Sequence, residues 1–144
     1  MATVLFLDFD GVLHPDPPNA EIPLWARSEI LQRWLDTHTE VGVVVSSTWR
    51  NTRTLVEIQS LLPKALASRV VGTTPKIVDE SYERQVECES WMRLHRNPWD
   101  KWIALDDRSW NFRPFEKRLI LTDRRTGLVE GDIARLDEAM RVIR

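Results

Sequence analysis

The sequence predicts an α/β fold: a single, doubly wound, mainly parallel sheet with helices on both faces. Three observations support this prediction. Short apolar runs have the continuous hydrophobicity of strands buried on both faces, segments of helical periodicity separate them, and glycines and prolines mark the turns between. Alternation of strands and helices favours parallel strand pairing. The chain has 144 residues, so we expect one domain over residues 1–144.

The expected strands are five short apolar segments. The first, Val4–Leu7, ends at Asp8, and the second, Val41–Val45, is rich in β-branched residues. Three further strands are expected at 69–71, 102–105 and 119–121. A proline-rich stretch over 14–23 follows the first strand and is expected to be a loop.

The first two helices lie on either side of the second strand in the sequence. Apolar residues recur at helical spacing from Ile30 to Leu35, and Ser28 is the expected cap of that helix. A second helix over 55–62 is expected to end before Pro63.

Two more helices follow. The third begins near Ser81 and ends near Asn97, with Cys88, Trp91 and Leu94 on one face. The last helix buries apolar residues between 133 and 143, and Asp132 is its expected cap.

Composition excludes several classes of protein. The net charge is −2, so no strong attraction to nucleic acid or membrane follows from charge alone. The single cysteine, Cys88, excludes an internal disulfide, and three scattered histidines disfavour a zinc site. No apolar run approaches the ~20 residues that span a bilayer, and no basic residue precedes Asp8 as a secretory signal would require. We expect a soluble, cytoplasmic protein.

Polar residues directly follow three of the expected strands. Asp8 and Asp10 follow the first, Ser46 and Ser47 follow the second, and the Asp106–Asp107 pair follows the fourth. Each pattern alone also fits turns and helix caps. Together they meet at the carboxyl edge of one parallel sheet, where α/β proteins place their sites. Clustered carboxylates repel one another, and Mg²⁺, which prefers oxygen ligands, is the cation that suits them.

These motifs carry a family resemblance. The segment LFLDFDGVL (5–13) resembles the first signature of the haloacid dehalogenase (HAD) superfamily, whose members are mostly phosphatases with a Rossmann-type fold. Val43–Ser47 resembles the second signature and Ile103–Asp107 the fourth. The segments SSTWR (46–50), LDDR (105–108) and LTD (121–123) are similar to a small branch associated with RNA-repair proteins and polynucleotide kinase–phosphatases.

The resemblance implies a role for each residue. Asp8 is the expected nucleophile that forms an aspartyl-phosphate, and Asp10 the expected general acid and base. Ser47, with Ser46 as the competitor, would contact a phosphoryl oxygen. Arg84 is expected to supply the cation of the third signature, with Lys76 as the alternative.

The same resemblance implies a Mg²⁺ ion. The expected ligands are Asp8, the backbone carbonyl of Asp10, and Asp106 or Asp107. Trp49, Trp110 and His14 either shape the mouth of this site or are core and rim residues.

The segments between the motifs are too short for an independently folded cap, so an open site is expected. Such a site suits a large phosphorylated substrate, such as a nucleic-acid end, and basic residues over 101–125 could line one edge of it. Two alternatives stay open: a non-catalytic HAD-like interaction module, and a small-metabolite phosphatase whose lid is a loop, for instance 14–23, or a second subunit. A receiver domain is disfavoured because the second strand ends in serines.

Overall fold

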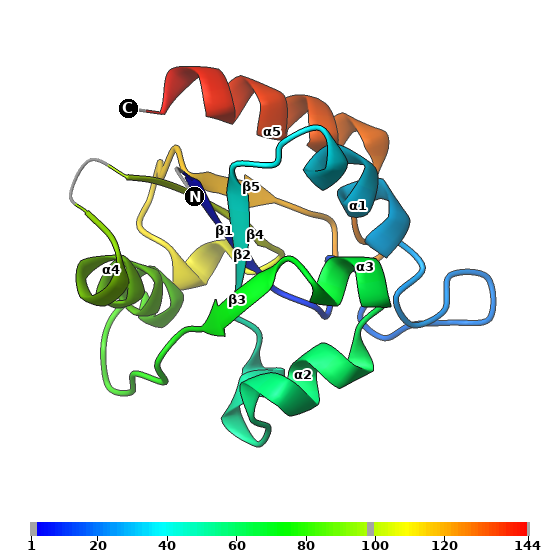
Figure 1. Cartoon of the computed structure of the whole chain (residues 1–144), viewed down its shortest axis with the longest axis horizontal. Coiled ribbons are helices and arrows are strands. Elements are labelled where there is room, and N and C mark those ends of the chain that lie inside the picture. Colours follow the sequence, from blue (N-terminus) through cyan, green and yellow to red (C-terminus); the bar gives the residue numbers. More distant parts are fainter. Residues whose placement is uncertain (1–2, 98–99, 144) are drawn as a thin grey trace.

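The computed structural model describes residues 3–97 and 100–143. Its core is one five-stranded sheet in the order β3-β2-β1-β4-β5, and all neighbouring strands are parallel (Figure 1). The strands are β1 (Thr3–Leu7), β2 (Val41–Val45), β3 (Val70–Thr73), β4 (Lys101–Asp106) and β5 (Leu119–Leu121). The predicted doubly wound α/β fold is confirmed, and the described residues contain no separately folded cap.

The described residues form five α-helices and two short 3-10 helices, all of which lie between strands except α5, which follows β5. They are α1 (Ser28–Asp36), η1 (Thr48–Asn51), α2 (Leu55–Leu61), α3 (Lys64–Ala67), α4 (Glu83–His95), η2 (Ser109–Asn111) and α5 (Glu130–Val142). The sequence did not predict α3, η1 or η2, which are too short to show a period. Among the described residues, no helix is long and apolar enough to cross a membrane.

Alternate side chains of the central strand β1 enter two different cores. Leu5 and Leu7 pack in a core with apolar residues of α1, α2, α3 and α5, whereas Val4 and Phe6 pack in a second core with α4. Phe6 makes edge-to-face contacts there with Trp91 and Trp102, at ring distances of 5.9 and 5.6 Å. Helices therefore cover both faces of the sheet, with α1 and α5 on one side and α4 on the other (Figure 1).

Two predicted helix caps are wrong. Ser28 is the first residue of α1 rather than its cap, which is Arg27, and the Ser28 hydroxyl donates to the carbonyl of Trp25. Asp132 is the third residue of α5, where its carboxylate accepts the N–H of Val129 at 2.9 Å. Both side chains lie inside the first turn of the helix and form a hydrogen bond with a residue that precedes the helix.

The buried face of α4 also differs from the prediction. Cys88 and Trp91 are buried as expected, but Leu94 is 73% exposed. In its place the helix buries Arg84 and Glu87, because its first turns lie against the ends of the strands, where polar partners are available. The first turns of α4 therefore contribute charged side chains to the candidate site.

Candidate active site

The strand ladder continues beyond the strand ends and holds the site backbone. The N–H of Asp8 donates to the carbonyl of Leu105 at 3.1 Å, and the N–H of Ser46 donates to that of Leu7 at 3.0 Å. Strand β1 lies between β2 and β4, so Asp8 emerges where the chain order of the sheet reverses. Ligands of open α/β sheets bind at this point.

Three carboxylates converge there. Asp8, Asp106 and Asp107 each place one oxygen so that all three oxygens lie within 4.8 Å of one another. Asp8 and Asp106 are buried, and Asp107 is half-buried. Among the described residues, Asp107 Oδ1 is shielded from solvent and lacks a hydrogen-bond partner. A buried carboxylate oxygen without a donor is costly, and a cation bound between the three groups would satisfy it.

Arg84 is the cation that the structure brings to this cluster. Its Nη1 donates to Asp106 Oδ2 at 2.8 Å and lies 3.7 Å from Asp8 Oδ1. Lys76 lies exposed on the loop after β3, on the wall of an adjoining pocket that Arg84 also lines. The contacts therefore favour Arg84 over Lys76 for the third signature.

A second arginine and a glutamate hold Arg84 in place. Glu87 lies one helical turn beyond Arg84, with its Oε1 3.5 Å from Arg84 Nε, and its Oε2 contacts Arg50 at 2.6 Å. Arg50 also donates to the backbone carbonyls of Ser46 and Ser47, both at 3.0 Å. The sequence alone assigned no role to Glu87 or Arg50. The signal for Glu87 was its spacing from Arg84 along α4, and the signal for Arg50 was its place in the SSTWR segment.

Burial is the main cause of the raised pKa values of the clustered carboxyls, and the charges of neighbouring groups modify them. Burial raises the pKa of Asp8 well above its ordinary value, and the Asp106 carboxylate raises it further. Burial likewise raises the pKa of Asp106 to about 6, although Arg84 acts against the shift. Burial alone would lower the pKa of Arg84, but Asp106 and Asp8 outweigh it and the net shift is upward. One guanidinium thus stays charged yet does not neutralise three carboxylates.

The two serines after β2 are both buried, and they differ in their contacts. Ser47 is the N-cap of η1, and its Oγ accepts the N–H of Trp49 at 3.3 Å. This bond uses an acceptor site of Ser47 and leaves its hydroxyl proton for another acceptor. Ser46 is held through its backbone N–H and carbonyl. The choice of Ser47 over Ser46 stays a prediction.

Gly11 joins the first and fourth motifs. Its φ is +81°, a conformation that residues with a Cβ rarely adopt, and a Cβ there would lie 2.2 Å from Asp107 Oδ2. The Thr122 hydroxyl donates to the Gly11 carbonyl at 2.7 Å, which fixes the turn from the other side. Only glycine can adopt this turn without a steric clash with the Asp107 side chain.

The Asp10 side chain is not part of the cluster formed by Asp8, Asp106 and Asp107. Its carboxylate is instead bonded by His14 and Trp49, at 2.8 and 2.9 Å. His14 is fully buried, so of the two readings open to the sequence it is a core residue, but one in direct contact with a candidate catalytic group.

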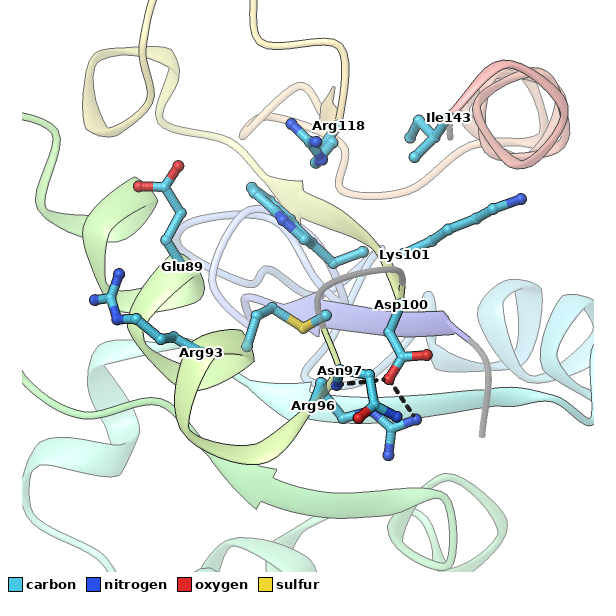
Figure 2. A pocket seen from close by; sticks show the side chains of 10 residues that line it. Glu89, Arg93, Arg96, Asn97, Asp100, Lys101, Arg118 and Ile143 are labelled. Atoms are coloured by element: carbon cyan, nitrogen blue, oxygen red, sulfur yellow. Dashed lines mark hydrogen bonds and ion pairs between the residues drawn. The ribbon is translucent and has the colours of Figure 1, made fainter.

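Two pockets differ in their relation to these residues. One, of about 140 Å³, adjoins Arg84 and is lined by three further basic residues, Arg50, Lys76 and Arg108. The other lies at the opposite end of β4, beside Lys101 and Trp102, and is lined mostly by residues around the end of α4 (Figure 2). It is far from the carboxylates and is not the candidate active site.

The basic residues of 101–125 are dispersed rather than gathered along one edge. Arg108 lines the pocket beside Arg84, whereas Lys101 and Arg118 line the pocket at the other end of the strand. Arg113 pairs with Glu89, Arg118 with Glu116, Arg124 with Asp16 and Arg125 with Asp123. Two of these pairs join residues two apart in the sequence, Arg118–Glu116 and Arg125–Asp123, and the other two join residues that only the fold brings together.

The raised pKa values predict how stability depends on pH without metal. A carboxyl whose pKa is raised by folding stabilises the protein below its ordinary pKa of 3.8, and that stability is lost as the pH rises through the raised pKa, which is about 6 for Asp106 and well above the ordinary value for Asp8. In chelator, Asp8→Asn should therefore melt at a higher temperature than the wild type at pH 7.5, and the difference should shrink at pH 4.5. Thermal denaturation at the two pH values measures this; an equal difference at both would contradict it.

Comparison with known proteins agrees with this geometry. No curated protein and no solved structure matched the chain. A family model described as the HAD domain in Swiss Army Knife RNA repair proteins matches residues 4–133, from β1 into α5. This range includes all the candidate site residues, and HAD domains are in general hydrolases of the phosphatase type that use Mg²⁺. The chain therefore belongs to the family of HAD domains found in Swiss Army Knife RNA repair proteins, and it is a capless member of the HAD superfamily.

Proposed function

We propose that this protein is a magnesium-dependent phosphatase that acts through an aspartyl-phosphate at Asp8, on the phosphate end of a nucleic acid. The observation that carries the proposal is the position of Asp8, buried at the switch point of the sheet beside two further carboxylates and one guanidinium. Family membership supports phosphatase chemistry in general.

The carboxylate cluster fits Mg²⁺. It offers hard oxygen ligands, it has too little positive charge, and it contains the unpartnered Oδ1 of Asp107. Asp8, Asp106 or Asp107, and the backbone carbonyl of Asp10 would hold the ion. Bound there, Mg²⁺ would offset the negative charge of the carboxylates and of the phosphoryl oxygens.

The protein side chains divide the reaction into two steps. In the first, a carboxylate oxygen of Asp8 attacks phosphorus and the bond to the leaving oxygen breaks, while Asp10 donates a proton to that oxygen. In the second, Asp10 takes a proton from water as the water oxygen attacks phosphorus, and inorganic phosphate leaves Asp8. Arg84 and the Ser47 hydroxyl would bind phosphoryl oxygens through both steps.

Three observations support a nucleic-acid end as the substrate. The site has no cap among the described residues, so a substrate must find its further contacts on an open surface. Four basic residues line the adjoining pocket, against two acids, Glu83 and Glu87. The matching family is described from RNA repair proteins.

The proposed function predicts that activity depends on Mg²⁺ and on the Asp8 carboxylate. Wild-type protein should hydrolyse an aryl phosphate with Mg²⁺ and stop in excess chelator. Asp8→Asn should abolish turnover while the protein stays folded, because an amide is a poor nucleophile and a poor metal ligand. Phosphate release and circular dichroism measure the two properties. A folded wild type that releases no phosphate from any phosphorylated compound would favour the alternative of an interaction module.

The third signature is tested by paired substitutions. Arg84→Ala should lower kcat/KM by at least about 100-fold, since a buried donor to the transferring group contributes several kcal/mol of transition-state stabilisation. Lys76→Ala should change it by less than about threefold, because Lys76 is exposed on a loop. The reverse order would assign the third signature to Lys76.

Substrate size gives the next prediction. For a 3′- or 5′-phosphorylated oligonucleotide, kcat/KM should exceed that for the matching mononucleotide by at least about tenfold, roughly 1.4 kcal/mol of transition-state binding. Added salt should reduce the ratio, because contacts of basic side chains with the backbone weaken with ionic strength. Equal or better turnover of the mononucleotide, or of a small sugar phosphate, would favour the small-metabolite alternative with a lid.

A further inference from the structure

The carboxylate of Asp10 is bonded at both of its oxygens. His14 Nε2 lies 2.8 Å from Asp10 Oδ1, and the indole N–H of Trp49 donates to Asp10 Oδ2 at 2.9 Å. The two donors come from different parts of the chain: His14 closes the turn after β1, and Trp49 lies in η1 after β2. Asp10 is thus held between the ends of two neighbouring strands.

The contacts of His14 define which ring nitrogen donates. Its Nδ1 lies 3.4 Å from the backbone nitrogen of Trp25, and because a backbone N–H only donates, Nδ1 is the acceptor. The ring proton is therefore on Nε2, facing Asp10. The ring is fully buried, whereas the Asp10 side chain is 33% exposed, so the carboxyl is held from the inside and remains accessible from outside. The Gly11 N–H donates to the His14 carbonyl at 2.9 Å and holds the backbone of the same turn.

Aromatic packing restricts the two donors. Phe9 contacts Trp25 and Trp49 edge to face, at ring distances of 5.2 and 5.6 Å. Trp25 also contacts the rings of Trp49, at 5.2 Å, and His14, at 5.0 Å. The guanidinium of Arg53 covers the Trp49 ring at 4.9 Å. Neither donor can turn away from Asp10 without disturbing this group of rings.

We propose that His14 and Trp49 are positioning residues that aim the Asp10 carboxyl at the leaving oxygen. The inference rests on the proposed function, in which Asp10 is the general acid. A general acid acts only within hydrogen-bond reach of the atom that it protonates. Each carboxylate oxygen has about two acceptor sites, so one donor on each oxygen fixes the group and leaves a site for the transferred proton.

Loss of either donor should alter the dependence on the leaving group. Nitro groups make dinitrophenolate a weak base that departs without a proton, whereas the more basic phenolate needs a proton from the general acid. The probes are therefore 2,4-dinitrophenyl phosphate and phenyl phosphate, assayed with Mg²⁺. Trp49→Phe keeps an aromatic ring for the edge-to-face contacts and loses the N–H. His14→Leu loses the donor, and His14→Gln restores an amide N–H within reach of Asp10.

For Trp49→Phe and His14→Leu, kcat/KM should fall by about tenfold or more with phenyl phosphate and by less than about threefold with 2,4-dinitrophenyl phosphate, as misplacement of a general acid requires. His14→Gln should recover most of the activity toward phenyl phosphate. The matched control is Trp34→Phe, which removes an indole donor to another aspartate, Asp137, at 2.8 Å and away from the site. It should change neither rate by more than about twofold, as expected for an independent site.

A double-substitution cycle separates positioning from a general loss of structure. In an Asp10→Asn background, Trp49→Phe should have no further effect on the phenyl phosphate rate, because the acid it positions is absent. Equal losses on both substrates, or additive losses in the cycle, would overturn the inference and leave the proposed function intact. A wild type that turns over neither substrate, although folded, would instead contradict the proposed function and the inference with it.

Discussion

The site depends on an imbalance of charge at the end of the sheet. Three carboxylates, those of Asp8, Asp106 and Asp107, converge at the ends of β1 and β4, where backbone hydrogen bonds hold Asp8 and Asp106 in the strand ladder. One buried guanidinium, Arg84, faces them, and burial raises the pKa values of Asp8 and Asp106 although Arg84 acts in the opposite direction. Burying such a group costs free energy, so the surrounding structure has to hold it together.

Each supporting contact can be understood from that imbalance. Glu87 and Arg50 extend the charges into an alternating network, in which Arg50 is also bonded to the backbone after β2. As a result Arg84 is held from both sides and cannot fold away toward solvent. Helix α4 contributes both Arg84 and Glu87, and its buried face is correspondingly polar at one end and apolar, at Cys88 and Trp91, at the other. One helix thereby joins the second core to the site.

The fold and the three members of the carboxylate cluster could be predicted from local sequence patterns, whereas Asp10, which the sequence placed with them, lies outside the cluster. Continuous apolar runs identify parallel strands, and residues directly after parallel strands share an edge, so the sequence alone places Asp8 and Asp106 together. The short helices α3, η1 and η2 lack a full period and were missed.

Side-chain partners across the fold were harder to predict. The Arg50–Glu87 pair, the burial of Glu87 in place of Leu94, and the contact of Trp49 with Asp10 all depend on rotamers and on the distance between elements. Sequence periodicity does not encode these. His14 lies near Asp10 in sequence, yet a proline-rich loop gives no period from which its direction could be predicted.

The close approach of Gly11 to Asp107 limits how this site could be grafted onto another protein scaffold. Atoms of the two segments occupy adjoining volumes so tightly that a single added methyl group would overlap a carboxylate oxygen. The segment from Asp8 to Gly11 therefore cannot be grafted alone. On a strand of another scaffold it would lack the Asp107 segment, against which its turn packs. Because the two residues are in steric contact, positions 11 and 107 should be varied together in any mutant library.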